Sequence, residues 1–300
     1  MKSENSELVR SVLSIDGRPY DVEIIKKAVA EPDAPRLVVV SRQPNSSATD
    51  VVRVCIQAVQ HFTKEPHELW VVDNNSPRDR LDWLVEWPDV NVVLNFTEPR
   101  PPDARTPSDE PGRNDQLTWA SYANAIGLEI AVRLIEPRSK YLMSMHMDTM
   151  PCHPQWLSFL KSKINERVRA AGVRMDTTRT PEGVLHVLGY LVDFQLFQQL
   201  GLDYLPALPE LDVGDRVTLK LREHGFDVFA CPSTLWEPDL ASRIPASSPL
   251  RTLGVDRAFD DDGRVIFLHL GRGVTKSIGV HQRGTLVDDW IRFADEHLFV

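Results

Sequence analysis

Cysteine is scarce in this sequence. The three cysteines, Cys55, Cys152 and Cys231, stand far apart and form no Cys-x-x-Cys pair. A structural zinc site and a disulfide framework are therefore not expected. The odd number of thiols fits a reducing environment, and we expect a cytoplasmic protein.

Long hydrophobic runs and an excess of basic charge are also missing. The apolar runs at residues 37–40 and 69–72 are far shorter than the roughly 20 residues that span a bilayer. Residues 1–13 are polar and mixed in charge, unlike a signal peptide. Lys and Arg number 34 against 43 Asp and Glu, which gives a net charge of −9. We therefore expect neither a transmembrane segment nor nucleic-acid binding through overall charge.

Three common catalytic motifs do not occur. No Gly-x-Gly-x-x-Gly follows the first predicted strand, and neither a Gly-x-x-x-x-Gly-Lys-Ser/Thr loop nor a Gly-x-Ser-x-Gly elbow is present. A dinucleotide-dependent dehydrogenase, a P-loop enzyme and a serine hydrolase are therefore disfavoured.

The composition is that of a folded protein, and the first half alternates strands and helices. Of 300 residues, 42% are hydrophobic and 26% are charged, values typical of globular domains. After an N-terminal extension over residues 1–35, apolar runs alternate with helical patterns to about residue 150. This alternation predicts an α/β fold with a mostly parallel sheet. The predicted strands are 37–41, 69–73, 90–94 and 141–145, and the predicted helices are 51–62, 80–87 and 117–135.

The second half is less regular and predicts a mixed sheet joined to the first, so that residues 36–300 form one domain. A loop without periodicity, rich in proline, is expected over residues 96–115. The predicted helices are 156–168, 195–200, 214–224 and 286–297, and the predicted strands are 184–192, 226–229 and 264–269.

Polar side chains follow three of the predicted parallel strands. Ligands of open α/β sheets bind beyond the carboxyl ends of the strands, where Ser41, Asp73 and His146 stand. Residues i and i+2 of a strand point to the same side, so His146 and Asp148 face one spot. An imidazole and a carboxylate suit Mn²⁺ or a similar divalent ion. On spacing alone, a partly buried histidine beside a capping aspartate fits equally well.

Two later segments carry further candidates. His269 ends the strand at 264–269, and Arg272 and Lys276 follow it, either as phosphate-binding bases or as solvated side chains. Asp212 and Asp215 precede a helix. They are either carboxylates that favour the helix dipole or a general base at the mouth of the sheet.

Taken in order, these segments resemble the nucleotide-sugar-dependent glycosyltransferases of the GT-A fold, family 2 in particular. The resemblance covers about residues 36–272. It is carried by Val-Val-Asp-Asn-Asn-Ser at 71–76, Asn-x-x-Gly at 124–127, His-x-Asp at 146–148, Trp-Leu at 156–157, the acidic residues before Leu-Arg-x-x-Gly at 221–225, and the strand that ends in His269.

The resemblance implies a GT-A-like three-layer sandwich with a nucleotide-binding half at about 36–150 and an acceptor half at about 151–300. It implies a role for each candidate. The nucleotide-binding residues are Ser41, Arg42, Asp73, Asn75 and Asn124, with Asp73 on the base. The metal ligands are Asp148, His269 and His146, which replaces the first aspartate of the family's Asp-x-Asp. The phosphate-binding residues are Arg272 and Lys276, and the catalytic base is Asp212, with Asp215 in reserve.

The implied activity is a hexosyltransferase reaction that depends on Mn²⁺ or Mg²⁺. A sugar passes from a nucleotide diphosphate donor, with a UDP-sugar favoured, to an acceptor hydroxyl with inversion. The loop over 96–115 is expected to order when the donor binds. Two alternatives stay open. One is a sugar nucleotidyltransferase, although residues 41–45 lack the glycine-rich loop that it needs. The other is a non-catalytic nucleotide-sugar-binding module of the same fold.

Overall fold

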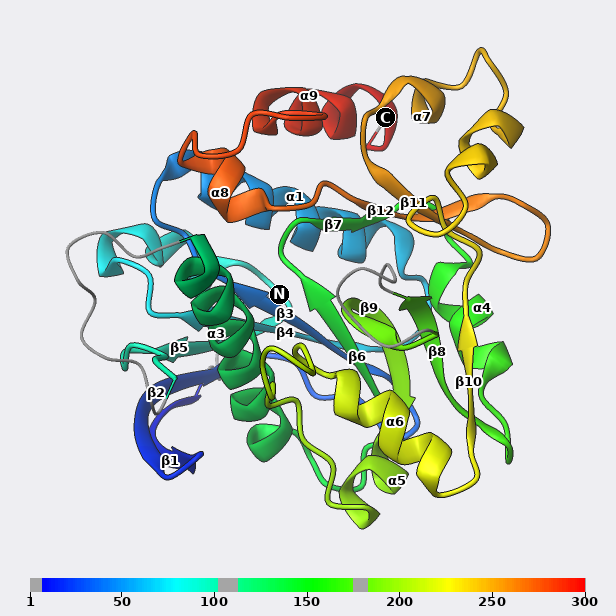
Figure 1. Cartoon of the computed structure of the whole chain (residues 1–300). Coiled ribbons are helices and arrows are strands. Elements are labelled where there is room, and N and C mark those ends of the chain that lie inside the picture. The colour runs from blue at the N-terminus through cyan, green and yellow to red at the C-terminus, as the bar shows by residue number, and fades with distance from the viewer. Residues whose placement is uncertain (1–6, 102–112, 175–182, 300) are drawn as a thin grey trace.

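A mixed nine-stranded sheet forms the centre of the structure (Figure 1). The computed structural model describes residues 7–101, 113–174 and 183–299. The strand order across the sheet is β1-β2-β5-β4-β3-β6-β9-β8-β10. The strands of this sheet are β1 (Glu7–Ile15), β2 (Arg18–Lys26), β3 (Arg36–Ser41), β4 (Glu68–Asn74), β5 (Val90–Asn95), β6 (Tyr141–His146), β8 (Val168–Arg174), β9 (Leu185–Asp193) and β10 (Asp227–Ala230).

The four middle strands β5, β4, β3 and β6 run parallel to one another. Beyond them, β9 pairs antiparallel with β6 and with β8, whereas β10 runs parallel to β8. The predicted fold class, a mostly parallel sheet with a mixed second half, is confirmed. The N-terminal segment that the sequence suggested as an extension forms the hairpin β1–β2, and β2 pairs antiparallel with β5 at the edge of the sheet.

Helices cover both faces of the sheet and make the three layers. The helices are α1 (Ser46–Phe62), α2 (Asp82–Glu86), α3 (Arg113–Leu134), α4 (Trp156–Lys163), α5 (Phe194–Gln199), α6 (Asp215–Glu223), α7 (Pro249–Thr252), α8 (Gly273–Ser277) and α9 (Val287–His297), with two 3₁₀ turns, η1 (Arg78–Arg80) and η2 (Pro238–Arg243). Side chains of a strand alternate between its faces. Accordingly, Leu37 and Val39 join the core beneath α1, α4 and α9, while Val38 and Val40 join the core beneath α3, α5 and α6.

A second, three-stranded sheet lies beside α1 and is built from β11 (Asp256–Phe259), β12 (Val265–His269) and β7 (Thr149–Pro151). Its middle strand β12 pairs antiparallel with β7, so that His269 lies opposite Thr149. This pairing brings the late strand to the chain segment that directly follows β6.

One predicted helix was wrong in its second half. The helix expected over 156–168 ends at Lys163, and β8 begins at Val168. The reason is a local turn, because the Asn165 side chain accepts hydrogen bonds from the backbone N–H groups of Arg167 and Val168. Asparagine side chains that bond nearby backbone groups in this way compete with the helix.

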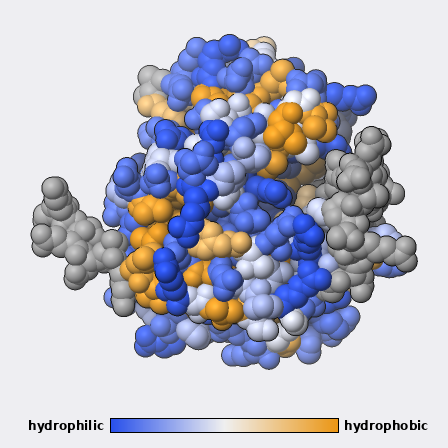
Figure 2. All heavy atoms as spheres, turned by 90° about the vertical axis from the view of Figure 1, so that its left-hand side faces the viewer, coloured by the Kyte–Doolittle hydropathy of each residue, from blue (hydrophilic) through white to orange (hydrophobic). Residues whose placement is uncertain are grey.

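Three further expectations concern membrane-spanning helices, the cysteines and the loop over 96–115. Within the described ranges, no helix combines the length and apolar character needed to cross a membrane. Figure 2 shows a mainly hydrophilic face with separate hydrophobic patches.

The three cysteines are free thiols, and the cytoplasmic setting stays a prediction. The expected ordering of the loop over 96–115 concerns residues 102–112, which lie outside the described part of the chain.

Asp73 ties together the two loops that follow β3 and β4. Its side chain is fully buried. One carboxylate oxygen accepts hydrogen bonds from the Ser41 and Ser76 hydroxyls and from the Gln43 amide, at 2.8–3.1 Å, and the other accepts from the Ser76 backbone N–H at 3.0 Å. Burial raises the pKa of Asp73, and these hydrogen bonds act against the increase. The carboxylate therefore fixes the shape of this edge of the sheet.

We predict that Asp73→Ala lowers the free energy of unfolding by roughly 1 to 3 kcal/mol, because it removes the acceptor for several buried donors. Urea denaturation measures the change. The matched control is Asp79→Ala, whose side chain is 79% exposed, and we expect it to change stability by at most about 0.5 kcal/mol. Equal effects of the two substitutions would contradict this role of Asp73.

Candidate metal centre

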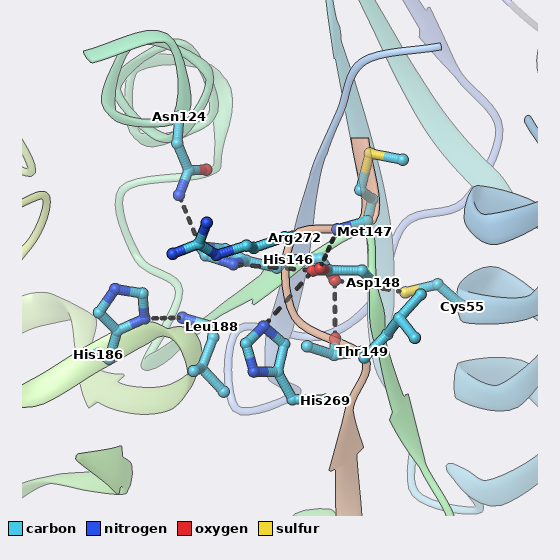
Figure 3. Close-up of polar contacts among 12 residues, drawn as sticks. Cys55, Asn124, His146, Met147, Asp148, Thr149, His186, Leu188, His269 and Arg272 are labelled. Carbon is cyan, nitrogen blue, oxygen red and sulfur yellow. Dashed lines mark hydrogen bonds and ion pairs between the residues drawn. The ribbon is translucent and has the colours of Figure 1, made fainter. Parts of the chain in front are cut away.

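Three side chains from distant parts of the sequence meet at the carboxyl end of β6. His146 is the last residue of β6, Asp148 lies between β6 and β7, and His269 ends β12. The backbone N–H of Leu270 donates to the Asp148 carbonyl at 2.9 Å, which fixes the end of β12 beside Asp148. Figure 3 shows the three side chains pointing toward one another.

The distances suit a shared cation. Asp148 Oδ1 lies 3.8 Å from His146 Nδ1 and 3.7 Å from His269 Nε2, and the three ligand atoms lie within 4.8 Å of one another. Two ligand atoms that bind one ion at about 2.1 Å are separated by roughly 3 to 3.5 Å, so small side-chain movements complete the site. Two imidazoles and one carboxylate form a donor set that suits a divalent transition metal.

Gly273 supports the Asp148 carboxylate from the other side. Its backbone N–H, at the start of α8, donates to Asp148 Oδ2 at 2.7 Å. A Cβ atom at position 273 would lie only 2.6 Å from the Asp148 Cβ. Only glycine therefore permits this close approach.

The electrostatics of the three groups are coupled. Burial lowers the pKa of His146 to about 4, although the Asp148 and Asp212 carboxylates act in the opposite direction. Burial alone would raise the pKa of Asp148, but the two histidines and the Gly273 N–H lower it below its usual value. For His269, the Asp148 and Asp256 carboxylates outweigh burial and raise its pKa. His146 is therefore neutral near pH 7, with a lone pair free to bind a cation.

Each histidine also has a partner outside the centre. The Asn124 amide nitrogen, on α3, lies 2.8 Å from His146 Nε2. The Asp256 carboxylate, on β11, lies 3.3 Å from His269 Nδ1. Asn124, which the resemblance implied for nucleotide binding, thus contacts a candidate metal ligand.

The two candidate bases lie together at the start of α6. Asp215 is fully buried, and its carboxylate accepts a hydrogen bond from the Asp212 backbone N–H at 2.7 Å. The Asp212 carboxylate accepts from the Val213 N–H at 2.7 Å. The Asp212 carboxylate acts to raise the pKa of His146, which links the start of α6 to the candidate metal centre.

Apart from Asn124, the predicted nucleotide-binding residues lie at or just beyond the ends of β3 and β4, on the edge of the sheet where β6 ends. Ser41 is buried and donates to Asp73. Arg42 has an exposed side chain, and its backbone N–H contacts the Met147 sulfur at 3.4 Å. Asn75 has a left-handed backbone (φ 66°) and donates its N–H to the Asn95 carbonyl. Arg42 is thus the one whose backbone contacts the His-x-Asp segment.

The two candidate phosphate-binding residues differ in their surroundings. Arg272 precedes α8, and its exposed side chain extends toward the side of the centre where Asn124 lies (Figure 3). Lys276 is buried, and its ammonium group donates to the carbonyls of Leu270 and Thr285 at 2.9 and 2.8 Å. Lys276 therefore holds the backbone around α8 in place, and Arg272 is the one of the two that solvent reaches.

Sequence reasoning missed three residues that shape the centre. Asp256 lies opposite His269 in the β11–β12 ladder, Gly273 contacts Asp148, and the buried ring of His186 lies edge-on to the ring of His146 at 5.3 Å. Nothing in the local sequence of Asp256 or His186 indicates a partner.

We predict that Gly273→Ala weakens Mn²⁺ binding at least tenfold, because the added methyl group displaces Asp148 and breaks its hydrogen bond. Isothermal titration calorimetry measures the affinity. Thr275→Ala on the same helix is the control, since the Thr275 hydroxyl bonds only the Arg272 carbonyl among the contacts described. Unchanged Mn²⁺ affinity in a folded Gly273→Ala protein would refute this account of Gly273.

Comparison with known proteins gives a likeness of fold. No protein-family model matches the sequence, and no curated protein matches it. Among solved structures, a mannosyltransferase from Pyrobaculum calidifontis in complex with GDP-Man and Mn²⁺ is similar at 16% identity and a TM-score of 0.45. The match covers 69% of this chain but only 58% of the mannosyltransferase chain.

Two further structures are similar at lower scores. The catalytic domain of Drosophila β1,4-galactosyltransferase 7 matches at 9% identity over 85% of this chain and 83% of its own, with a TM-score of 0.40. Glucosyl-3-phosphoglycerate synthase from Mycobacterium tuberculosis matches at 15% identity over 66% of this chain and 68% of its own, with a TM-score of 0.36. The solved structures that are similar to this chain thus include glycosyltransferases, at identities below 25% and TM-scores below 0.5.

Proposed function

We propose that the protein transfers a sugar from a nucleotide diphosphate donor to an acceptor hydroxyl, with a divalent cation held by His146, Asp148 and His269. The observation that carries the proposal is the convergence of these side chains at the carboxyl end of a parallel strand. That edge of an open α/β sheet is where such folds bind ligands. Asp73 and the loops that it fixes lie at the ends of the neighbouring strands.

The donor set favours Mn²⁺ over Mg²⁺. Two of the three ligands are imidazoles, and imidazole suits transition metals, whereas Mg²⁺ prefers carboxylate, carbonyl and water oxygens. When bound, the cation would offset the charge of the leaving diphosphate as a Lewis acid. Arg272 is the base best placed to add a charge-assisted contact to phosphate oxygens.

Of the two acidic residues at the start of α6, Asp212 is the better candidate for the base. Asp215 is fully buried and accepts the Asp212 backbone N–H, which suits a residue that positions its neighbour. Asp212 interacts electrostatically with His146 and would take the proton of the acceptor hydroxyl as that oxygen attacks the anomeric carbon. A single base opposite the leaving group implies inversion at that carbon.

The proposal predicts that Mn²⁺ and a nucleotide sugar together raise the melting temperature of the protein. Ligands that bind only the folded state stabilise it by about 2.7 kcal/mol at 100 times their Kd. We expect the UDP-sugars to give the largest shift in a panel that includes GDP-sugars, and Mg²⁺ to give a smaller one. Thermal shift assays with the wild type and with Asp148→Ala test this, and the substitution should remove the metal-dependent part.

The control for this experiment is Asp262→Asn, which removes a carboxylate that is 72% exposed on the β11–β12 turn. It should keep the full shift. If no nucleotide sugar produces a metal-dependent shift in the wild type, or if Asp148→Ala retains it, the proposed donor site is wrong.

A second prediction concerns turnover. Asp212→Asn should keep nucleotide binding and slow transfer by about 10²- to 10⁴-fold, the usual contribution of a positioned general base. Release of the nucleoside diphosphate, followed with a coupled assay, measures the rate. Normal turnover by Asp212→Asn would remove Asp212 as the base.

The same assay separates the alternatives. Release of pyrophosphate in place of a nucleoside diphosphate would indicate a sugar nucleotidyltransferase. Donor binding by the wild type without turnover on any acceptor would instead favour a non-catalytic binding module.

A further inference from the structure

Each imidazole of the metal centre has one nitrogen facing Asp148 and the other facing a residue outside the centre. In His146, Nδ1 faces Asp148 at 3.8 Å and Nε2 faces Asn124 at 2.8 Å. In His269 the nitrogens are exchanged, because Nε2 faces Asp148 at 3.7 Å and Nδ1 faces Asp256 at 3.3 Å. The outer partners differ in chemistry, since one is a carboxamide and the other a carboxylate.

This difference determines whether the outer partner fixes the tautomer of each imidazole ring. A neutral imidazole carries one N–H and one lone pair, and only the nitrogen with the lone pair binds a metal. A carboxamide offers either a donor or an acceptor, so Asn124 is compatible with both tautomers of His146. A carboxylate accepts only, so Asp256 requires the hydrogen on His269 Nδ1. Asp148 does not compete for this hydrogen, because its Oδ1 lies 3.7 Å from Nε2, beyond hydrogen-bond distance. The lone pair is then on Nε2, the atom that faces Asp148.

The backbone holds Asp256 at this position. Asp256 lies directly opposite His269 in the antiparallel β11–β12 ladder. The next residue, Arg257, is buried, and its guanidinium donates to the carbonyls of Leu250 and Val255 at 2.8 and 2.7 Å. These bonds anchor the segment that leads into β11. The imidazole ring of His269 separates Asp256 from the centre, so Asp256 does not share the ion as a ligand.

We propose that Asp256 is a positioning residue that fixes the tautomer and the orientation of His269, so that Nε2 is ready to bind the cation. This inference rests on the metal centre of the proposed function. Outer carboxylates that hold a metal-binding histidine in this way commonly change metal affinity by about 10- to 100-fold.

The first test uses the protein without added metal, at a pH above the pKa of His269, where the imidazole is neutral. Long-range ¹H–¹⁵N correlation spectra report which nitrogen of a neutral imidazole carries the hydrogen. We expect the hydrogen of His269 on Nδ1 in the wild type and a mixture of tautomers in Asp256→Ala. A wild-type His269 with its hydrogen on Nε2 would overturn the proposal, whether or not any variant folds.

The second test measures Mn²⁺ affinity by calorimetry, with no nucleotide and no turnover. Asp256→Ala should weaken binding by about 10- to 100-fold. Asp256→Asn should weaken it less, because its amide oxygen still accepts from Nδ1–H. Asp262→Asn removes an equal charge from an exposed position of the same hairpin and should bind as the wild type does.

The outcomes distinguish the two claims. Equal Mn²⁺ affinity in the wild type and Asp256→Ala would overturn the role of Asp256, as would equal losses in Asp256→Ala and Asp262→Asn, which would indicate an effect of charge alone. A wild type that binds Mn²⁺ but transfers no sugar would refute the proposed function and leave the role of Asp256 intact. A wild type that binds no Mn²⁺ would overturn the metal centre, and with it the role of Asp256 in metal binding.

Discussion

The short antiparallel pairing of β12 with β7 is the constraint on which the candidate site depends. It places His269 opposite Thr149, one residue beyond Asp148, and the Leu270 N–H bond to the Asp148 carbonyl extends it. The ladder is short, but its strands contribute Met150, Phe267 and Leu268 to the core. Burial of large apolar side chains contributes about 1.5–3 kcal/mol each, so packing compensates for the small number of ladder bonds. The candidate metal centre thus depends on a core that has no chemical role itself.

That geometry places the ionisable side chains of His146, Asp148 and His269 close together in a buried site, where their charges influence one another. The Asp148 carboxylate is stabilised by two imidazoles and one backbone N–H, which lower its pKa despite burial. The two imidazoles respond differently. Burial leaves His146 neutral, whereas Asp148 and Asp256 raise the pKa of His269. A divalent ion bound by the three groups would compensate the Asp148 charge directly, because a bound cation is the largest local charge in such a site.

The strands and helices that the sequence predicted are those with a clear hydrophobic periodicity. Contacts that depend on the register between strands were not predicted. The apolar runs of β3 and β4 and the helical spacing of α1 were confirmed, because their burial patterns repeat over many residues. The strand-end rule pointed to His146, the i+2 spacing added Asp148, and His269 was singled out because it ends a later strand. The structure brings these three residues together. By contrast, β7 and β11 have three and four residues and show no readable period. The sequence therefore could not identify Asp256 as a partner of His269, because their contact follows only from the register of the β11–β12 ladder. Sequence also cannot show that the ammonium group of Lys276, a predicted phosphate ligand, donates to two carbonyls.

Position 146 carries a histidine where the family that the motifs resemble has the first aspartate of Asp-x-Asp. This histidine fits the charges and side chains around it. A second carboxylate there would place two like charges in a buried site, and like charges at short range resist joint ionisation. It would also lie against Asn124 and the edge of the His186 ring. A neutral imidazole avoids the repulsion and still supplies a lone pair, with a second nitrogen left for Asn124. In the proposed site, a histidine at this position would therefore favour metals that prefer nitrogen ligands.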